Sequence, residues 1–330
     1  MERRQLGTSD LKVSPIIFGA WAIGGWLWGG TDDDEAIRAI HASLDAGVNT
    51  IDTAPVYGFG HSEEIVGKAI KGRREKVIVA TKCGPRWTRT DGVFSMNVKL
   101  PDGREAPLHR VLKRDSILEE CDMSLKRLGV EAIDLYQCHW PDTTTPMEES
   151  MEALLKLKDE GKIRHIGVSN FPAELIGKSL SLGPIVSDQP RYNLIKREIE
   201  KDVLPFCRKH GVGVIAYSPM EHGLLSGKVT MDRTFKGDDL RVKHPWYKPE
   251  NRKRVIEALE TVRPIAEAHG VSLAQMAVNW VISEPGVTAA IVGTRNPKQA
   301  VENARAASFK LRDDERAFLR KTFEELGQPV

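Results

Sequence analysis

The chain has 330 residues, enough for a large buried core arranged as two ordinary domains or as one α/β barrel. A formal net charge of +2, with 28% charged and 41% hydrophobic residues, gives no general electrostatic attraction to nucleic acid or to a membrane. The four cysteines show neither CxxC nor Cys/His metal spacing, which disfavours disulfides and zinc and favours reduced thiols. The N-terminus has no apolar signal-peptide core, and no apolar run approaches the roughly 18 residues of a membrane span. We therefore expect a cytoplasmic protein.

The predicted elements repeat one strand–helix unit along the chain. Residues 5–13 read as a short hairpin, and residues 15–19 as an apolar strand followed by a loop rich in Gly and Trp. An acidic run after Thr31 suits the start of a helix. Further strands are predicted from residue 50 and at 77–82, 132–139, 165–169, 184–189, 213–217 and 289–292. Helices are predicted near 62–70, 117–128, 151–157, 201–210, 252–268, 272–283, 297–306 and 311–326, and from residue 172.

Eight apolar strands alternating with helices predict a (β/α)8 TIM barrel, with residues 1–330 as a single domain. The alternative is an open, doubly wound sheet, which usually has a G-x-G-x-x-G turn after its first strand. The turn here, from Gly19 to Gly24, does not match that spacing. Two long loops, 84–112 and 220–251, follow the third and seventh strands and so lie on the face where barrel active sites are found.

Polar residues end three consecutive predicted strands: Asp52, Lys82 and His139. Side-chain alternation places Lys82 and His139 on the faces that their strands turn to the barrel interior. Tyr57 follows Asp52 by five residues and could fold back over the group. An ammonium group beside a phenol favours the phenolate, so we expect Lys82 to lower the pKa of Tyr57 and make it a general acid for carbonyl reduction. The alternative for these residues is a buried ion pair, a core Tyr and a core His.

Reduction of a carbonyl needs a hydride from a cofactor as well as a proton donor. We therefore looked to the ends of the later strands for residues that bind the cofactor. Ser169 and Asn170 end the fifth strand and Gln189 the sixth, which suits the binding of a carboxamide. Tyr217 ends the seventh strand, where its ring could stack on a flat heterocycle. The alternative is that these residues only cap the helices that follow. The segment 223–228 has close-approach glycines and a Lys, a weak phosphate-binding signal that does not match a P-loop. No set of metal ligands or paired carboxylates stands at the strand ends.

Several long motifs in a fixed order resemble the aldo-keto reductases. They are GVNTIDTAPVYGFGHSEEIVGKA at 47–69, the strand ending in Lys82, DLYQCHWPD at 134–142, GKIRHIGVSN at 161–170 and GLLSGK at 223–228. WAIGGWLWGGTDDD at 21–34 and FKGDDLR at 235–241 resemble the bacterial general-stress-protein type. The resemblance implies an NADPH-dependent TIM barrel that reduces aldehydes or ketones to alcohols. It also implies a catalytic tetrad of Asp52, Tyr57, Lys82 and His139, with Tyr57 as the proton donor.

The same resemblance, together with the strand-end residues, predicts the cofactor site. The predicted cofactor-binding residues are Gly19, Ala20, Trp21, Asp52, Ser169, Asn170, Gln189, Tyr217, Ser218, Met220, Gly223, Leu224, Ser226, Lys228, Gly293, Thr294, Arg295, Gln299 and Asn303. Many members of the family carry Lys and Arg near the eighth strand for the 2'-phosphate of NADPH, where this chain has Gly293 and Gln299. We assign that role to Arg295, because a guanidinium can bind phosphate through two hydrogen bonds. NADH is the less favoured cofactor.

The substrate is predicted only as a small carbonyl compound, with no nucleic-acid or membrane partner, and the oligomeric state is left open. Five tryptophans follow strands and either line an apolar mouth above Tyr57 or only pack the loops: Trp21, Trp26, Trp28, Trp87 and Trp140. A rival function is an NADP(H)-binding regulatory or redox-sensing subunit on the same fold, similar to the potassium-channel β subunits. The complete tetrad favours the enzyme.

Overall fold

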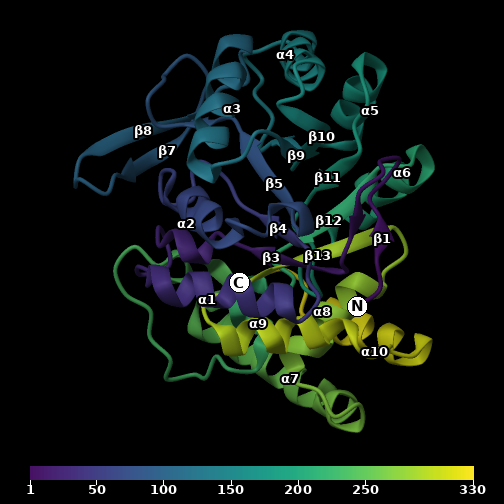
Figure 1. Cartoon of the computed structure of the whole chain (residues 1–330). Helices are drawn as coiled ribbons and strands as arrows, with labels where there is room; N and C mark the ends of the chain where they lie inside the picture. The colour runs from purple at the N-terminus through teal and green to yellow at the C-terminus, as the bar shows by residue number, and fades with distance from the viewer.

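The computed structural model describes residues 1–330, with a closed barrel of eight parallel strands at its centre (Figure 1). The barrel strands are β3 (Ile16–Gly19), β4 (Thr50–Asp52), β5 (Ile78–Cys83), β9 (Ile133–Cys138), β10 (Ile163–Ser169), β11 (Ser187–Gln189), β12 (Gly213–Tyr217) and β13 (Val287–Gly293). They pair in chain order, and β13 pairs with β3 to close the ring. The predicted TIM barrel is confirmed, and the open sheet is excluded because no edge strand remains in the ring.

Helices surround this barrel and cover the outer faces of its strands (Figure 1). They are α1 (Asp33–Asp45), α2 (His61–Ile70), α3 (Arg114–Leu128), α4 (Met147–Asp159), α5 (Ala173–Leu182), α6 (Val203–His210), α7 (Pro249–Ala268), α8 (Leu273–Ser283), α9 (Pro297–Ala304) and α10 (Asp313–Glu324). The N-cap of α1 is Asp32, whose carboxylate accepts a 2.8 Å hydrogen bond from the amide of Glu35. None of the helices is long and apolar enough to span a bilayer.

The barrel interior has its own small apolar cluster, distinct from the large layer between strands and helices. Ala80 of β5 and Leu135 of β9 belong to this interior cluster. The predicted N-terminal hairpin, β1 (Arg4–Gln5) with β2 (Lys12–Val13), contributes Leu6 to it and so closes the barrel at the end away from the catalytic loops. Because side chains alternate along a strand, the inward position of Ala80 also directs Lys82 inward.

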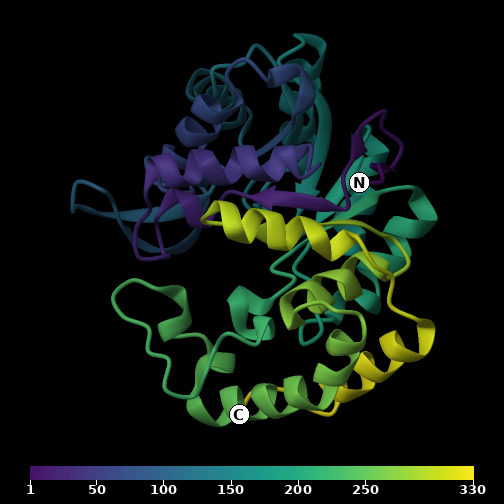
Figure 2. The same ribbon diagram turned by 60° about the horizontal axis from the view of Figure 1, so that its bottom comes forward.

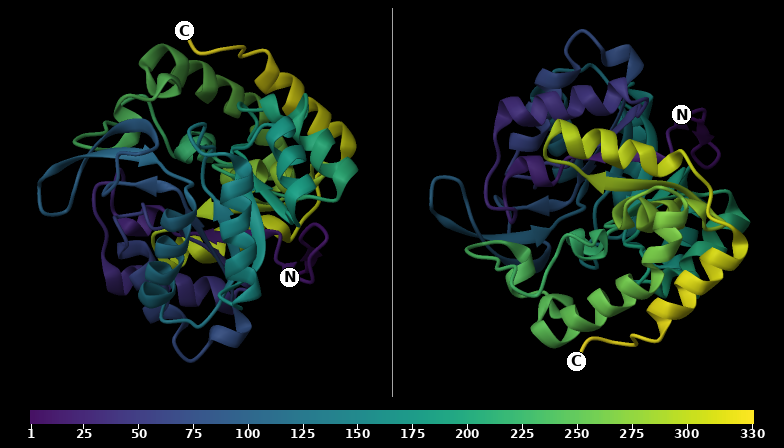
Figure 3. Two further views of the ribbon diagram at one scale, coloured as in Figure 1. Left: turned by 90° about the horizontal axis from the view of Figure 1, so that it is seen from above. Right: turned by 90° about the horizontal axis from the view of Figure 1, so that it is seen from below.

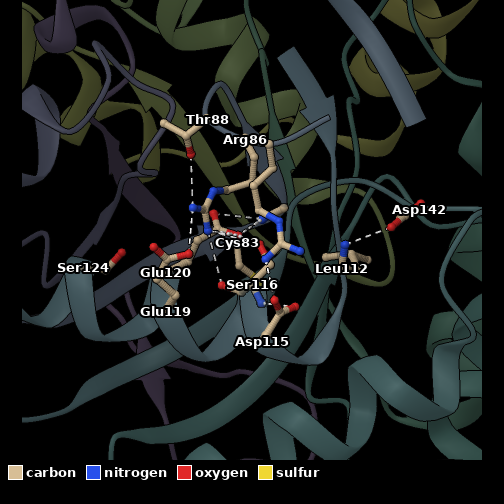
Figure 4. Close-up of polar contacts among 12 residues, drawn as sticks. Cys83, Arg86, Thr88, Leu112, Asp115, Ser116, Glu119, Glu120, Ser124 and Asp142 are labelled. Atoms are coloured by element: carbon tan, nitrogen blue, oxygen red, sulfur yellow. Dashed lines mark hydrogen bonds and ion pairs between the residues drawn. The ribbon is translucent and has the colours of Figure 1, made fainter. Parts of the chain in front are cut away.

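The segment 84–112, expected to be a loop, contains a three-stranded antiparallel sheet formed by β6 (Pro85–Arg86), β7 (Val93–Lys99) and β8 (Glu105–Arg110). The β7–β8 hairpin extends away from the barrel on the same side as the loop before α7 (Figures 2 and 3). Arg86 fixes the base of the hairpin to α3, donating to the Ser116 hydroxyl at 3.1 Å and to Glu119 at 2.9 Å (Figure 4). Four consecutive residues of β7 are exposed, so this strand lies outside the packed core of the barrel.

The second long loop, between β12 and α7, contains three short 3-10 turns: η4 (Glu221–Ser226), η5 (Leu240–Val242) and η6 (Pro245–Tyr247). The loop is joined to the Gly/Trp loop after β3. The Leu240 amide donates to the Leu27 carbonyl at 3.2 Å, and the Leu27 amide donates to Asp238 at 3.2 Å. The Arg241 guanidinium lies 5.2 Å from the Trp28 ring centroid. The two loops therefore meet above the strand ends.

Candidate active site

The four residues predicted as catalytic meet at the carboxyl ends of β4, β5 and β9. The Lys82 ammonium, fully buried, donates to Asp52 Oδ2 at 2.7 Å and to the Thr53 carbonyl at 2.8 Å, and lies 3.3 Å from the Tyr57 hydroxyl. The rings of His139 and Tyr57 are 5.7 Å apart in an edge-on arrangement. A continuous polar chain therefore runs from the Asp52 carboxylate through the ammonium to the phenol.

The protonation of this group differs from the sequence-based expectation. Burial, followed by the charge of Asp52, raises the pKa of Tyr57 well above 10, and outweighs the lowering expected from Lys82. Burial also lowers the pKa of Lys82, while Asp52 opposes that change, and it lowers the pKa of His139 well below 6.5. At neutral pH Tyr57 is thus a protonated phenol and His139 a neutral imidazole. A protonated phenol is the form that can donate a proton to a carbonyl oxygen.

Tyr57 is held by a turn that two glycines make possible. Gly58 has a φ of +67°, and a Cβ added to it would lie 2.2 Å from the Gly24 carbonyl oxygen. A Cβ on Gly24 would lie 2.8 Å from the Tyr57 carbonyl carbon and oxygen. This close approach lets the Trp21 ring stack on Tyr57, at 5.9 Å between centroids and 25° between planes.

The residues predicted to hold a carboxamide form one hydrogen-bonded network next to Asp52. The Gln189 amide donates to Asp52 Oδ1 at 2.7 Å, and the Ser169 hydroxyl donates to the Gln189 carbonyl at 2.7 Å. The Asn170 side chain donates to the Ser169 hydroxyl at 3.0 Å and accepts from the Tyr217 hydroxyl at 2.9 Å. The structure therefore brings these four strand-end residues together beside the Asp52 carboxylate.

A cavity of about 330 Å³ opens over Asp52 and Tyr57 and extends toward β13. Twelve of the predicted cofactor-binding residues line it: Gly19, Trp21, Asp52, Ser218, Met220, Gly223, Ser226, Lys228, Gly293, Arg295, Gln299 and Asn303. Three others are buried away from it in the protein, namely Ala20, Leu224 and Thr294. The Thr294 hydroxyl, for instance, donates to the Val292 carbonyl at 3.1 Å, which is a structural bond within the turn.

Arg295 has a structural role that its position in the sequence did not reveal. Its guanidinium donates to the Trp28 carbonyl at 3.2 Å and to the Gly30 carbonyl at 2.7 Å, and so joins the turn after β13 to the Gly/Trp loop. It pairs with no carboxylate within 4.0 Å, unlike Lys228 in the same cavity, which lies 2.9 Å from Glu302. The charge of Arg295 therefore remains uncompensated by direct ion pairing at the edge of the cavity.

The five tryptophans do not form one pocket. Trp21 and Trp28 line the cavity over Tyr57. Trp26 borders a separate cleft of about 1220 Å³ beneath the β7–β8 hairpin, and Trp87 packs against Phe59 beside it, with ring centroids 5.2 Å apart. Trp140 stacks under the Arg110 guanidinium at 4.7 Å. The first two are placed to contact a ligand above Tyr57, and the other three pack the surrounding loops.

Eight residues that line the cavity were not predicted: Ala22, Pro219, His222, Arg233, Arg241, Ala274, Ile291 and Glu302. Among them His222 lies between the predicted Met220 and Gly223. Its side chain contacts Arg191, which follows β11 by two residues. Nothing in the sequence pairs residues 191 and 222, because the contact crosses from one βα loop to another. The only sequence signal was the unusual Glu-His step inside a segment rich in Gly and small residues.

Comparison with known proteins gives one consistent result. Residues 15–323 match the family model described as the aldo/keto reductase family. The chain is similar to the aldo-keto reductase YhdN of Bacillus subtilis (strain 168), with 39% identity covering 100% of this chain and 96% of that protein. It is 38% identical to the NADH-specific methylglyoxal reductase of Escherichia coli (strain K12), covering 99% of both.

The chain is also similar to a protein of known structure. The glycerol dehydrogenase AKR11B4 from Gluconobacter oxydans superposes with a TM-score of 0.89 at 40% identity, covering 100% of this chain and 97% of that one. The match extends over the barrel and over both long loops, because it covers the whole chain. With the tetrad assembled and the cavity formed above it, the chain belongs to the aldo/keto reductase family of oxidoreductases, which reduce carbonyl groups to alcohols.

Proposed function

We propose that this enzyme reduces small aldehydes or ketones reversibly with NADPH, and that Tyr57 is the proton donor. The observation that supports the proposal most strongly is the chain Asp52–Lys82–Tyr57, which ends at the floor of the cavity. Asp52 keeps Lys82 charged, and the ammonium stabilises negative charge on the phenol oxygen as the proton leaves. The neutral His139 is a hydrogen-bond donor that can orient a carbonyl oxygen between its ring and Tyr57.

The residues around the cavity fit a nicotinamide dinucleotide phosphate. Four cationic side chains line it, Lys228, Arg233, Arg241 and Arg295, which suits a ligand with several phosphate groups. Ser169, Asn170 and Gln189 do not line this cavity themselves; their amide and hydroxyl groups form the network beside Asp52, which does line it. When bound, the nicotinamide supplies the hydride that no amino-acid side chain can provide.

The substrates named for the relatives suggest the first compounds to test. One relative is a methylglyoxal reductase and one structural neighbour is a glycerol dehydrogenase. Both names point to short, oxygen-rich molecules that would fit above Tyr57 in a cavity of limited volume. We propose that short 2-oxo- and 2-hydroxy-carbonyl compounds are substrates. Turnover of methylglyoxal and glyceraldehyde, compared with that of long alkyl aldehydes, tests this directly.

The Tyr57→Phe variant tests the proton donor. Phenylalanine keeps the stacking on Trp21 but removes the hydroxyl group, so kcat should fall at least about a hundredfold, as expected for loss of a general acid. The Kd for NADPH, measured by calorimetry, should change less than about threefold. Retention of more than a tenth of the wild-type kcat would assign the proton transfer to another group.

The choice between the two nicotinamide cofactors is tested at Arg295. If this guanidinium binds the 2'-phosphate, Arg295→Ala should raise the KM for NADPH about tenfold or more and leave the KM for NADH nearly unchanged. Because Arg295 also joins two loops, a purely structural role would weaken both cofactors by the same factor. Equal weakening, or a wild-type preference for NADH like that in the name of the E. coli relative, would refute the assignment.

A further inference from the structure

Arg110, the last residue of β8, carries a charge that nothing in the protein neutralises. The other arginines of the segment 84–112 each pair with a carboxylate: Arg86 with Glu119 at 2.9 Å, Arg89 with Asp91 at 2.6 Å and Arg104 with Asp102 at 2.6 Å. The half-buried side chain of Arg110 makes no hydrogen bond and no ion pair. Its guanidinium lies over the ring of Trp140, 4.7 Å from the centroid.

The backbone of Arg110 is fixed at the end of the barrel that holds the catalytic residues. β8 is the central strand of the small sheet, and Arg110 pairs with Pro85 of β6 on one side and with Val93 of β7 on the other. The amide of the next residue, Val111, donates to the Gly84 carbonyl at 2.9 Å. Because Gly84 and Pro85 directly follow β5, Arg110 lies beside the carboxyl end of that catalytic strand.

The side chain of Arg110 is on the face of β8 that is turned toward Tyr57. Leu108 belongs to the small apolar cluster that contains Tyr57, and Ala106 packs against the same cluster. Side chains alternate along a strand, so Ala106, Leu108 and Arg110 share this face, whereas His109 is on the opposite one. The guanidinium is therefore directed to the same side as the catalytic phenol.

Arg110 is also the excess positive charge beside the tetrad. The ammonium of Lys82 and the carboxylate of Asp52 form an ion pair at 2.7 Å, so together they have no net charge. Burial, then Lys82 and then Arg110 lower the pKa of His139, so the guanidinium is close enough for its charge to act on the imidazole. The indole Nε1–H of Trp21, which stacks on the catalytic phenol, is a second donor without an acceptor in the protein. A ligand with negatively charged oxygens would complement both groups.

We propose that Arg110 selects carbonyl substrates that carry an anionic oxygen group, a carboxylate or a phosphate, near the reacting carbonyl. A planar guanidinium can donate two parallel hydrogen bonds to such a group, and stacking on Trp140 leaves its N–H edges free to do so. The inference rests on the proposed function, because it requires a carbonyl to be reduced over Tyr57. It adds the charge of the substrate and the residue that recognises this charge.

The test compares pairs of aldehydes that differ by an anionic group. Methylglyoxal and glyoxylate form one pair, because the acetyl group of the first has nearly the shape of the carboxylate of the second. Glyceraldehyde and glyceraldehyde 3-phosphate form the other, so the two pairs distinguish a carboxylate from a phosphate. In the wild-type enzyme, the anionic member of at least one pair should have the higher kcat/KM.

The Arg110→Met variant should remove this preference. In the pair that shows it, the ratio of the anionic to the neutral kcat/KM should fall about ten- to a hundredfold, the effect of losing hydrogen bonds to a charged group. Arg110→Lys keeps the positive charge but not the planar fork, so its ratio should lie between those of wild type and Arg110→Met. Each ratio is taken within one preparation and so does not depend on the folded fraction.

A matched control and the ratio itself separate anion recognition from a structural role. Arg104→Met removes an exposed arginine of the same hairpin, paired with Asp102, and should leave both ratios within about twofold of wild type, because exposed charges are screened. If Arg110 only packs on Trp140, or acts only through the pKa of His139, its loss changes both members of a pair alike and the ratio stays constant.

The failure of this inference differs from the failure of the proposed function. Ratios below one for both pairs in the wild-type enzyme, or ratios that do not change in Arg110→Met, would overturn the selection of anions and leave carbonyl reduction standing. A wild-type protein that reduces none of these aldehydes with either nicotinamide cofactor would overturn both.

Discussion

Lys82 has no exposed surface, although it carries one of the most strongly hydrated charges in proteins. Such a burial is tolerated only where the ammonium is fully paired, and here Asp52 and the Thr53 carbonyl supply the partners. The same low-dielectric setting raises the pKa of Tyr57 and lowers that of His139. Tyr57 thus keeps its proton, which is the state that its proposed role as proton donor requires.

Glu120 is a second buried ionisable residue, and it lies beneath the catalytic strand β5. Its carboxylate accepts from the Gly84 amide at 3.1 Å and from the Ser116 hydroxyl at 3.3 Å (Figure 4). Burial raises its pKa from 4.5 to about 8, against the opposing effects of Arg86 and these hydrogen bonds. Between these two pH values the folded state holds more protons than the unfolded state, so stability should fall as the pH rises through this interval.

The Glu120→Gln variant should remove this pH dependence. One pKa unit corresponds to about 1.4 kcal/mol, so the variant should gain about 2 kcal/mol or more over wild type between pH 5 and pH 8. Urea unfolding at several pH values measures the difference. Glu119→Gln, on the neighbouring exposed residue, is the matched control and should show the wild-type pH profile. Parallel profiles for Glu120→Gln and wild type would contradict the prediction.

At the scale of elements, the site depends on loops that touch at glycines. The Gly/Trp loop after β3 and the turn after β4 approach so closely that a Cβ on Gly58 cannot be accommodated. The contact positions Trp21 over Tyr57, and the loop between β12 and α7 adds hydrogen bonds from the other side. Three segments distant in sequence therefore form the wall of one cavity.

Gly58→Ala tests this contact against a matched control. Gly58 and Gly129 have nearly equal φ values, +67° and +64°, but a Cβ on Gly129 meets no atom within 4 Å. Alanine at either position pays the cost of a left-handed backbone, roughly 1 kcal/mol. Only Gly58→Ala should also displace Tyr57, with a loss of at least about 2 kcal/mol in unfolding free energy and about tenfold in kcat. Equal effects of the two substitutions would show that the close approach is unimportant.

At the scale of the whole molecule, the two ends of the barrel have different tasks. The N-terminal hairpin fills the lower end with Leu6, Leu11 and Val13, while the long loops build the cavity at the upper end. The hairpin residues that close the barrel and the residues that line the cavity therefore lie at opposite ends of the strands, as is usual for this architecture.

The Leu6→Ala variant should lower the stability of the protein and leave its kinetic constants nearly unchanged. Leu6 is 1% exposed, so its truncation should cost about 2–5 kcal/mol of unfolding free energy through lost burial and a cavity. Values of kcat and KM below the melting transition should stay within about twofold of wild type. Urea unfolding and steady-state kinetics on the same preparation give both numbers. A large loss of kcat at an unchanged Tm would mean that the hairpin is coupled to the site.

Local sequence patterns predict much of this arrangement. Eight apolar strands with helices between them predict parallel βα units, and the absence of a G-x-G-x-x-G turn after the first strand favours the barrel over an open sheet. Strand parity places Lys82 beside Asp52, because alternation fixes which side chains of a strand point inward. The resemblance to the family predicts the roles of Tyr57 and His139, and the structure adds the contacts of Tyr57 with Lys82 and with His139.

Other features were decided only by the tertiary structure. In β7 the residues Phe94, Met96 and Val98 alternate with polar residues, but Phe94 and Met96 are exposed in the hairpin, so this period does not mark a strand of the core. The pKa of Tyr57 is raised mainly by burial, and this burial depends on loops that are distant in the chain. The bonds of Arg295 and of Arg191 join loops separated by tens to hundreds of residues. Local sequence determines which elements form and which way their side chains point, whereas dielectric environment and loop contacts arise only when distant segments pack together.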